Sequence, residues 1–339
     1  MNSQMLPDYI QFLMKGDVYT PPVDAVRLIQ THISFVIVAG GFVYKWKKPV
    51  DLGFLNFSTL TRRRYFCGQE LILNRRLCPE VYLSLIKLTQ DEDSFRIEGR
   101  GRIVEYGVKM VRLPEERMMN RLIEQGDVSR ADIDRIVDRL VPFYNRSESS
   151  GRITRYGSAR QVGRSVVDNF RQTEAFVGER GLGADRFKRI VAYSTQFLTN
   201  ERIFRQRMMD GRIRDCHGDL HTANICLTDE VAIFDCIEFS PRLRYTDVAA
   251  DVAFLSMDLD FHGLHNLSQY FVDRFMLVSG DTELRAILNF YKCYRAYVRG
   301  KINLLTAADS HVDRSVAEKC RGKAWDCFAL AELYADQKD

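Results

Sequence analysis

The sequence predicts an α+β protein of two lobes: a small N-terminal lobe with an antiparallel sheet and one helix, and a larger, mostly helical C-terminal lobe. Up to Pro114 the apolar runs are short, rich in β-branched residues and separated by turn residues, whereas later runs follow a 3.6-residue period. The 339 residues also suffice for two hydrophobic cores. We therefore place the lobe boundary after residue 112, which gives lobes of residues 1–112 and 113–339.

The N-terminal lobe is expected to contain a β-hairpin followed by a helix. The hairpin strands are Ile33–Val38 and Phe42–Trp46, and Ala39-Gly40-Gly41 between them supplies a tight turn. The next segment predicts a helix, Ser58–Leu77, which is capped by its first residue and stopped by Pro79. Further strands are expected at Val81–Leu88, at Phe95–Ile97 and in the run that ends at Pro114.

The C-terminal lobe is expected to be a set of helices with one short hairpin. The segment "SESSGRITRYGS" resembles a mobile loop, and two short apolar runs, Ile225–Leu227 and Val231–Phe234, flank the turn "TDE". Periodic apolar positions predict helices near Arg130–Ser147, Arg160–Glu179, Asp185–Met209, Tyr245–Asp260, Leu267–Val278, Thr282–Leu305 and Arg314–Ala335.

The composition is that of an ordinary globular protein, with 46% hydrophobic and 28% charged residues. A net charge of +4 is too small and too dispersed to indicate a nucleic-acid partner. Eight cysteines without a C-x-x-C pair favour reduced thiols and a cytoplasmic location. Pro7 and Asp8 interrupt any apolar run that could open a secretory signal, and no apolar stretch is long enough to span a bilayer, so no membrane partner is expected.

The stretch "CHGDLHTANICLTDEVAIFDCIEF" concentrates polar and ionisable residues between apolar runs. Asp219 is followed five positions later by Asn224, and Asp235 comes after the short hairpin. A loop carboxylate, an amide at the end of that loop and a second carboxylate match a template for phosphoryl transfer, in which a base acts with an Asn and an Asp that hold Mg²⁺ on the phosphates. Oxygen ligands without a thiolate also fit Mg²⁺.

Phosphoryl transfer further requires a cation for the phosphates, and Lys45 follows the predicted Gly40-Gly41 turn. A lysine in a cleft needs a carboxylate partner. Glu70 is the single acidic residue on the basic helix that follows, so we expect it to pair with Lys45. Lys47 lies on the same strand face as Lys45, so either lysine could contact the phosphates.

The segments "HGDLHTANI" and "IFDCIEF" resemble the aminoglycoside phosphotransferase and choline kinase family, a branch of the protein-kinase-like fold, and further segments resemble a bacterial subgroup of it. The resemblance implies a bilobal fold and a kinase that uses ATP and Mg²⁺. By that resemblance Asp219 is the catalytic base, Asn224 and Asp235 are the Mg²⁺ ligands, Lys45 and Glu70 clamp the phosphates, and the backbone of Met110, Val111, Arg112 and Leu113 meets adenine.

Several nearby residues have simpler structural roles. His217 is expected to orient the backbone near Asp219, and a zinc site with His221 is disfavoured because Gly218 interrupts the required helix. Either Asp247 or Asp251, one helical turn apart, is expected to brace the loop.

The acceptor pocket is open to two interpretations. Glu238, Arg295 and Arg299 are candidate substrate contacts, and the two arginines, one turn apart on a helix, would suit an anionic or sugar-like acceptor. Alternatively, these arginines pair with carboxylates at Asp247, Asp251 or Asp258 and never meet substrate.

Two functions follow. The first is a small-molecule kinase that phosphorylates a hydroxyl group of a sugar, an aminoglycoside or an amino alcohol. The second is a catalytically weak or inactive nucleotide-binding scaffold with the kinase shape. The complete set of Asp219, Asn224 and Asp235 favours the kinase, because a scaffold needs no base. The acceptor, the choice between ATP and GTP and the oligomeric state stay open.

Overall fold

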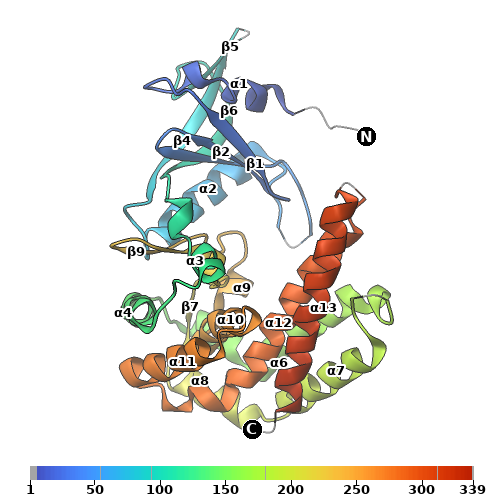
Figure 1. Cartoon of the computed structure of the whole chain (residues 1–339). Helices are drawn as coiled ribbons and strands as arrows, with labels where there is room; N and C mark the ends of the chain where they lie inside the picture. The colour runs from blue at the N-terminus through green and yellow to red at the C-terminus, as the bar shows by residue number, and fades with distance from the viewer. Residues whose placement is uncertain (1–5, 54, 93, 180, 311, 338–339) are drawn as a thin grey trace. The chain divides into compact units, whose positions relative to one another are not determined.

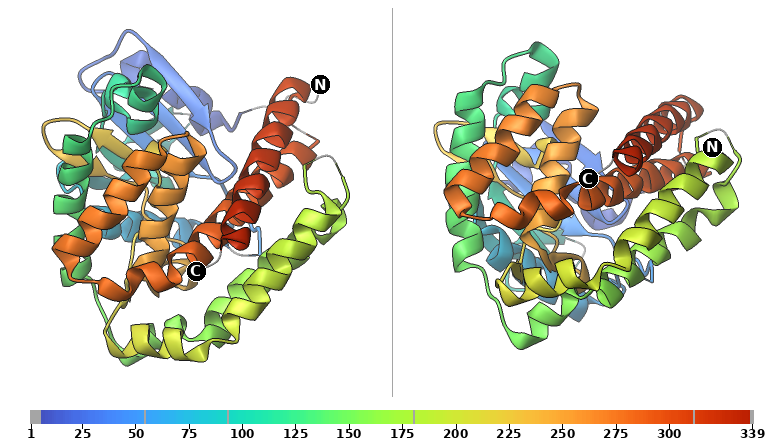
Figure 2. Two further views of the ribbon diagram at one scale, coloured as in Figure 1. Left: turned by 60° about the horizontal axis from the view of Figure 1, so that its bottom comes forward. Right: turned by 90° about the horizontal axis from the view of Figure 1, so that it is seen from below.

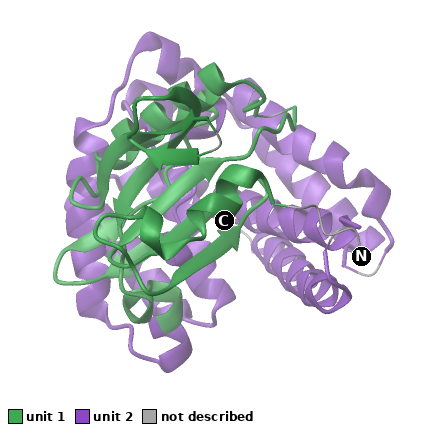
Figure 3. Ribbon diagram, turned by 90° about the horizontal axis from the view of Figure 1, so that it is seen from above, with its two compact units in different colours: residues 1–121, 225–241 green, residues 122–224, 242–339 purple. Residues whose placement is uncertain are grey.

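The structure is a computed structural model that describes residues 6–53, 55–92, 94–179, 181–310 and 312–337 (Figure 1). The chain divides into two compact units, which Figure 3 colours separately. The first unit contains residues 1–121 and 225–241, and the second contains residues 122–224 and 242–339. This division differs from the boundary expected after residue 112, because the first unit extends to Arg121 and also includes the later segment 225–241.

The first unit is built on a six-stranded antiparallel sheet with the strand order β1-β2-β3-β6-β4-β5. Strand β3 lies between β2 and β6, so its lysines are positioned by ladders on both sides. The edge strand β1 escaped the sequence analysis because most of its side chains are exposed and its apolar alternation is weak. The strands are β1 Val26–Gln30, β2 Ser34–Ala39, β3 Phe42–Lys47, β4 Tyr82–Asp91, β5 Ser94–Ile97 and β6 Arg102–Val111.

The expected hairpin is confirmed as β2 and β3. Ala39 pairs with Phe42, so Gly40 and Gly41 form a two-residue turn. Gly40 has φ +57°, a left-handed conformation that glycine adopts without the steric penalty of a Cβ.

Helix α2 (Leu60–Asn74) packs on β4 and β6. Its N-cap is Thr59, whose side chain accepts a hydrogen bond from the backbone N–H of Arg62 at 3.3 Å. The cap expected at Ser58 was wrong by one residue, because the Ser58 hydroxyl donates to Asn56 Oδ1 at 2.7 Å. The buried face of α2 carries Glu70 into the interior of the first unit.

The chain returns to the first unit as a short hairpin of strands β8 (Ile225–Leu227) and β9 (Val231–Ile233), which confirms the two expected apolar runs. All six residues are buried. Arg117 Nε donates to the carbonyl of Leu227 at 2.8 Å, and Met118 bridges to Cys226. The hairpin thereby delivers Asp235 to the first unit, two residues after β9.

In its described residues, the second unit is helical apart from one two-stranded ladder, β7 (Ile213–Asp215) with β10 (Tyr245–Asp247). Figure 2 shows the long helices α12 and α13 lying along each other. The helices are α4 Arg130–Arg146, α5 Gly151–Thr154, α6 Ala159–Thr173, α7 Ala184–Leu198, α8 Glu201–Met209, α10 Val248–Phe261, α11 His265–Ser279, α12 Arg285–Ala308 and α13 Arg314–Asp336.

Helix α10 is buried on every side. Every residue from Val248 to Leu259 is buried, as expected for a helix that is apolar around its whole circumference. Its N-cap, Asp247, accepts from the N–H of Ala249 at 2.9 Å. The few polar side chains of this buried helix therefore need hydrogen-bond partners inside the protein.

Two expectations for the second unit were wrong. The segment expected as a mobile loop forms α5 and a 3-10 turn, because Ile153 is fully buried and Gly157 packs against Ile213. The helix expected over residues 185–209 is interrupted at Thr199-Asn200, two poor helix formers. Within the described residues, no helix combines the length and apolar character needed to cross a membrane.

The remaining short elements connect these parts. They are α1 Asp8–Leu13, the 3-10 turns at Gly16–Val18, Glu115–Arg117, Arg155–Gly157, Glu174–Phe176, Thr222–Asn224 and Thr282–Leu284, and the helices α3 Met119–Gln125 and α9 Pro241–Arg244.

Candidate active site

The polar loop of residues 216–224 follows strand β7 in the second unit. Antiparallel pairing of Asp215 with Tyr245 fixes the point where the loop begins. Gly218 has φ +87°, so the sharp turn before Asp219 requires a residue without a Cβ. The loop ends in the 3-10 turn Thr222–Asn224.

Two carboxylates of α10 hold the backbone of this loop. Asp251 accepts from the N–H of His217 at 2.7 Å and from the N–H of Gly218 at 3.0 Å. Asp258, about two turns further along α10, accepts from the N–H of Thr222 at 2.9 Å and from its hydroxyl at 2.6 Å. The loop is therefore fixed near both ends by one buried helix.

The expected brace is confirmed for Asp251, whereas Asp247 caps α10 and pairs with Arg207, with Oδ1 2.6 Å from Nη2. The part played by Asp258 was missed, because its partner Thr222 lies 36 positions earlier in the chain. Only the position of Asp258 two turns after Asp251 could have indicated it.

Asp219 and Asn224 lie together in this loop. Asn224 Nδ2 donates to the Asp219 carbonyl at 3.0 Å and lies 3.3 Å from Asp219 Oδ2. The N–H of Asp219 donates to His217 Nδ1 at 3.2 Å, which confirms that His217 orients this backbone. The side chain of Asp219 is 36% exposed, so its carboxylate is open to a ligand while its backbone is fixed.

His221 is a neighbour of Asp219 that sequence reasoning considered only as a metal ligand. Its Nε2 lies 3.4 Å from Asp219 Oδ2, and its ring lies against Phe254 with centroids 5.4 Å apart. Burial alone would raise the pKa of Asp219, but His221, followed by Arg299 and His217, outweighs burial and holds that pKa well below its usual range. Asp219 is therefore ionised at neutral pH.

In the first unit, Lys45 forms the expected ion pair with Glu70, with Nζ 2.8 Å from Oε1. The same Nζ lies 2.6 Å from Asp235 Oδ1. Burial alone would lower the pKa of Lys45, but the charges of Asp235 and Glu70 raise it well above its ordinary value. The strand lysine, the helix carboxylate and the carboxylate after the hairpin thus meet at one point.

Lys47 forms a second, more deeply buried ion pair. Its Nζ lies 2.7 Å from Glu70 Oε2, contacts Glu238 Oε1 and sits 4.8 Å from the ring centroid of Phe57. The side chain of Lys47 is 1% exposed, against 15% for Lys45. Of the two lysines, Lys45 is therefore the more accessible to a ligand.

The backbone of Asp235 has an unusual conformation, with φ +63°. A non-glycine residue in this region carries a strain that is typical of functional sites. Two hydrogen bonds hold it there: the N–H of Asp235 donates to the Tyr82 hydroxyl at 3.2 Å, and the N–H of Cys236 donates to Asn74 Oδ1 at 2.8 Å. The Asp235 side chain is 44% exposed.

The segment expected to meet adenine continues β6 beyond its end. The N–H of Val111 donates to the carbonyl of Val81 at 2.8 Å, and the N–H of Arg112 donates to the carbonyl of Gly41 at 2.9 Å. Met110 is a buried core residue of the same strand. Among the described residues, the N–H of Leu113 has no hydrogen-bond partner, so in this segment it is the donor left for a ligand.

The candidate acceptor residues have different environments. Glu238 is buried and contacts Lys47, and Arg295 is buried and donates to the carbonyl of Gly218 at 3.0 Å and to that of Ala250 at 3.1 Å. Both side chains are thus engaged internally. Arg295 Nη2 also lies 3.6 Å from Asp251 Oδ1, so the alternative interpretation, pairing with a carboxylate, holds for Arg295. The Arg299 guanidinium, one turn further along α12, has no hydrogen bond or ion pair within the described part of the chain.

The chain is similar in sequence to proteins of Mycobacterium tuberculosis and Mycobacterium bovis that are described as uncharacterized. The identity is 32% over 275 residues, which cover 80% of this chain. The chain spans about half, 53%, of the length of these relatives. No family model matches the chain.

Solved structures with a similar fold include three small-molecule kinases. A choline/ethanolamine kinase family protein from Mesorhizobium loti gives a TM-score of 0.50 at 12% identity, covering 91% of this chain and 92% of its own. A glucosamine kinase with glucosamine, ADP and inorganic phosphate gives 0.50 at 13%, covering 92% and 76%. An aminoglycoside phosphotransferase from Streptomyces rimosus gives 0.50 at 16%, covering 86% and 98%. The chain therefore has the fold of the aminoglycoside phosphotransferases and the choline and ethanolamine kinases.

Proposed function

We propose that this protein transfers the γ-phosphate of ATP, bound with Mg²⁺, to a hydroxyl group of a small molecule. The observation that carries the proposal is the state of Asp219, an ionised and partly exposed carboxylate on a loop that buried carboxylates fix at both ends. A scaffold that only binds nucleotide has no need of a carboxylate held in this way.

Asp219 would orient the acceptor hydroxyl and take its proton. Because its pKa is low, it is a weak base, and early removal of an alcohol proton by it is unfavourable. Phosphoryl transfer passes through a loose transition state, so the proton can leave late, and positioning of the hydroxyl contributes most. Asn224 and His221 would keep the carboxylate in place for this task.

The first unit would bind the nucleotide. Lys45, paired with Glu70 and Asp235, offers a cation of raised pKa for the phosphates. Leu113 offers an N–H to the adenine ring, while the neighbouring amides of Val111 and Arg112 are bonded within the protein. In the Met110–Arg112 backbone, which was expected to meet adenine, the carbonyl groups are therefore the atoms proposed to contact the ring.

The donor set suits Mg²⁺. Asn224 uses its Nδ2 within the loop, so its amide oxygen is directed elsewhere, and Asp235 has a partly exposed carboxylate. Both are oxygen ligands of the kind that Mg²⁺ prefers. When bound, the ion would neutralise negative charge on the phosphates, and Asn224 and Asp235 would hold it.

The acceptor is proposed to carry an alcohol group on a sugar-like, aminoglycoside-like or amino-alcohol-like body. The glucosamine kinase in the comparison contains glucosamine and ADP. Arg299 lies close enough to Asp219 to lower its pKa, and its guanidinium has no hydrogen bond or ion pair among the described residues, so it favours an acceptor with an anionic or strongly hydrogen-bonding group. Glu238 and Arg295 have internal partners, so neither is proposed to contact the acceptor.

The test is Asp219→Asn, which keeps the side-chain volume and removes the charge. ADP release should be measured with ATP, Mg²⁺ and a panel of sugars, aminoglycosides and amino alcohols, beside a nucleotide titration of the same protein. We expect nucleotide affinity to be kept and turnover to fall by about 10²–10⁴-fold. Turnover at the wild-type level in the variant would exclude the base, and absence of turnover from the wild type with every acceptor would favour the scaffold.

A further inference from the structure

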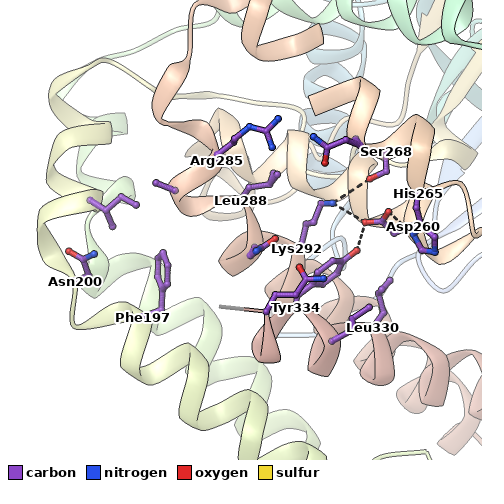
Figure 4. Close-up of a pocket in the computed structure, with 16 residues that line it drawn as sticks. Phe197, Asn200, Asp260, His265, Ser268, Arg285, Leu288, Lys292, Leu330 and Tyr334 are labelled. Atoms are coloured by element: carbon purple, nitrogen blue, oxygen red, sulfur yellow. Dashed lines mark hydrogen bonds and ion pairs between the residues drawn. The ribbon is translucent and has the colours of Figure 1, made fainter. Parts of the chain in front are cut away.

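A hollow of about 830 Å³ lies in the second unit, among α10, α11, α12, α13 and the junction of α7 with α8 (Figure 4). No residue of the 216–224 loop lines it. Sites for small molecules typically enclose about 300–1,000 Å³. The hollow therefore has the size of a ligand site. The phosphoryl transfer proposed at Asp219 does not use it.

The polar wall of the hollow is centred on Asp260, whose carboxylate already has three partners. Lys292 Nζ lies 2.8 Å from its Oδ2, the Tyr334 hydroxyl donates to the same oxygen at 2.5 Å, and His265 Nδ1 lies 3.0 Å from Oδ1. Lys292 also lies 3.3 Å from the Ser268 hydroxyl. Figure 4 shows these groups directed toward one another. A cationic ligand would find no free carboxylate here.

The cations of the hollow are likewise paired. Lys292 is matched by Asp260, and Arg285 forms an ion pair with Asp273, which also accepts from Gln269 Nε2 at 3.1 Å. An anionic ligand would have to compete with an existing carboxylate for each of them. A desolvated charge without a new partner opposes binding, so the lining disfavours ligands of either sign.

The uncharged lining combines amides with apolar surface. The Asn200 side chain makes no capping bond to α8 and is exposed to the hollow, where it offers both a donor and an acceptor. The Phe197 ring stacks on Phe290 with centroids 4.6 Å apart and remains half-buried, so part of it faces outward. Leu288 and Leu330 complete an apolar wall.

The Asn200 amide, which can both donate and accept, lies beside an aromatic ring and aliphatic side chains, and this lining matches a molecule with many hydroxyl groups and exposed C–H faces. We propose that this hollow is a second ligand site, which binds a neutral polyhydroxylated molecule of the carbohydrate class. The site is independent of ATP and of the Asp219 loop.

The test is a titration of the whole protein with maltose, without nucleotide, followed by calorimetry and by saturation-transfer NMR. Ala286→Trp places a large ring at an exposed position that lines the hollow, and Ala308→Trp makes the same change at an exposed position of the same helix outside it. We expect the first variant to bind at least tenfold more weakly and the second to bind as the wild type does. Asn200→Ala should weaken binding several-fold.

Two further experiments test the charge of the ligand and the independence of the hollow from the Asp219 loop. Glucosamine and glucuronate should bind more weakly than neutral sugars, and Asp219→Asn should bind maltose as the wild type does. Stronger binding of either charged sugar that is lost in Ala286→Trp, and therefore takes place in the hollow, would overturn the ligand class. Equal binding by Ala286→Trp and the wild type, or no saturable binding of maltose at millimolar concentration, would overturn the site. Unfolding midpoints of all variants show whether each is folded.

Discussion

Two lysines of one strand, Lys45 and Lys47, differ in how deeply their side chains are buried. Both reach Glu70, but Lys47 is sealed by Glu238 and the ring of Phe57. A buried ion pair that loses one partner leaves an unpaired charge in a low-dielectric interior. At the scale of single residues, burial therefore separates a lysine that maintains the fold from one that is available to phosphates.

The same substitution at both positions tests this difference. Lys47→Met should lower the free energy of unfolding by about 3–5 kcal/mol, measured by urea denaturation, because Glu238 loses its partner. Lys45→Met should change stability less, since Glu70 keeps Lys47 and Asp235 is partly exposed, but should weaken binding of the ATP–Mg²⁺ complex in calorimetry at least tenfold. A loss of nucleotide binding confined to Lys47→Met would reverse the two assignments.

At the scale of elements, α10 serves as a rigid support for the polar loop. Asp251 and Asp258 lie about two turns apart on it and accept from opposite ends of the loop. Arg295 of α12 adds a hydrogen bond to the Gly218 carbonyl. The position of Asp219 thus depends on a helix that contributes nothing directly to the proposed chemistry.

Two substitutions at Asp258 separate positioning from folding. Asp258→Ala leaves the N–H and the hydroxyl of Thr222 without this acceptor, at a cost of about 1–3 kcal/mol for the orphaned group. We expect lower turnover, unchanged nucleotide affinity and faster hydrogen exchange of loop amides. Asp258→Asn retains an acceptor oxygen and should recover most of the turnover. If both variants match the wild type in exchange and in turnover, the loop does not need this contact.

Elements with a strong local pattern were the ones that the sequence could predict. The β2–β3 hairpin has a glycine turn and β-branched strands, and α12 and α13 have sustained periodicity. Segments that are ordered by distant contacts could not be predicted in this way. Ile153 and Gly157 fold as a helical turn because they pack on β7, which lies far along the chain.

In the candidate active site, too, contacts marked by a local sequence pattern could be predicted and contacts between distant residues could not. Lys45 with Glu70 was predictable because one acidic residue stood on a basic helix next to the lysine strand. The contact of Lys47 with Glu238 joins residues 191 positions apart, and no local pattern marks it. His221 was overlooked because its contact with Asp219 depends on the loop conformation.

At the scale of the whole molecule, the first unit has an uneven charge balance. Lys45 and Lys47 face three carboxylates: Glu70, Asp235 and Glu238. Burial opposes the charge of Glu70, but the two lysines outweigh burial and lower its pKa to about 2. Burial raises the pKa of Glu238 against the attraction of Lys47. The network thus carries one more negative than positive charge when fully ionised.

The lowered pKa of Glu70 predicts a loss of stability in acid. Because the folded pKa of Glu70 lies below its unfolded value of about 4.3, its contribution is present above that value and disappears as the pH falls towards about 2. Denaturation curves should show Glu70→Gln less stable than the wild type at pH 7, by roughly 3 kcal/mol, with the gap narrowing below about pH 4. Asp24→Asn, at an exposed position, serves as the control. A gap that is constant with pH would contradict the ion pairs.

The first unit is assembled from two distant stretches of the chain, and this has a consequence for synthesis on the ribosome. Its core joins Cys67, Tyr82 and Val108 to Cys226 and Ala232 of the returning hairpin. A nascent chain that ends at residue 121 lacks that hairpin and also two of the three carboxylates that face Lys45 and Lys47, namely Asp235 and Glu238. The unit nearer the N-terminus therefore cannot finish folding before residue 241 has been translated, and an N-terminal fragment cut at the unit boundary would not be a self-sufficient nucleotide-binding module.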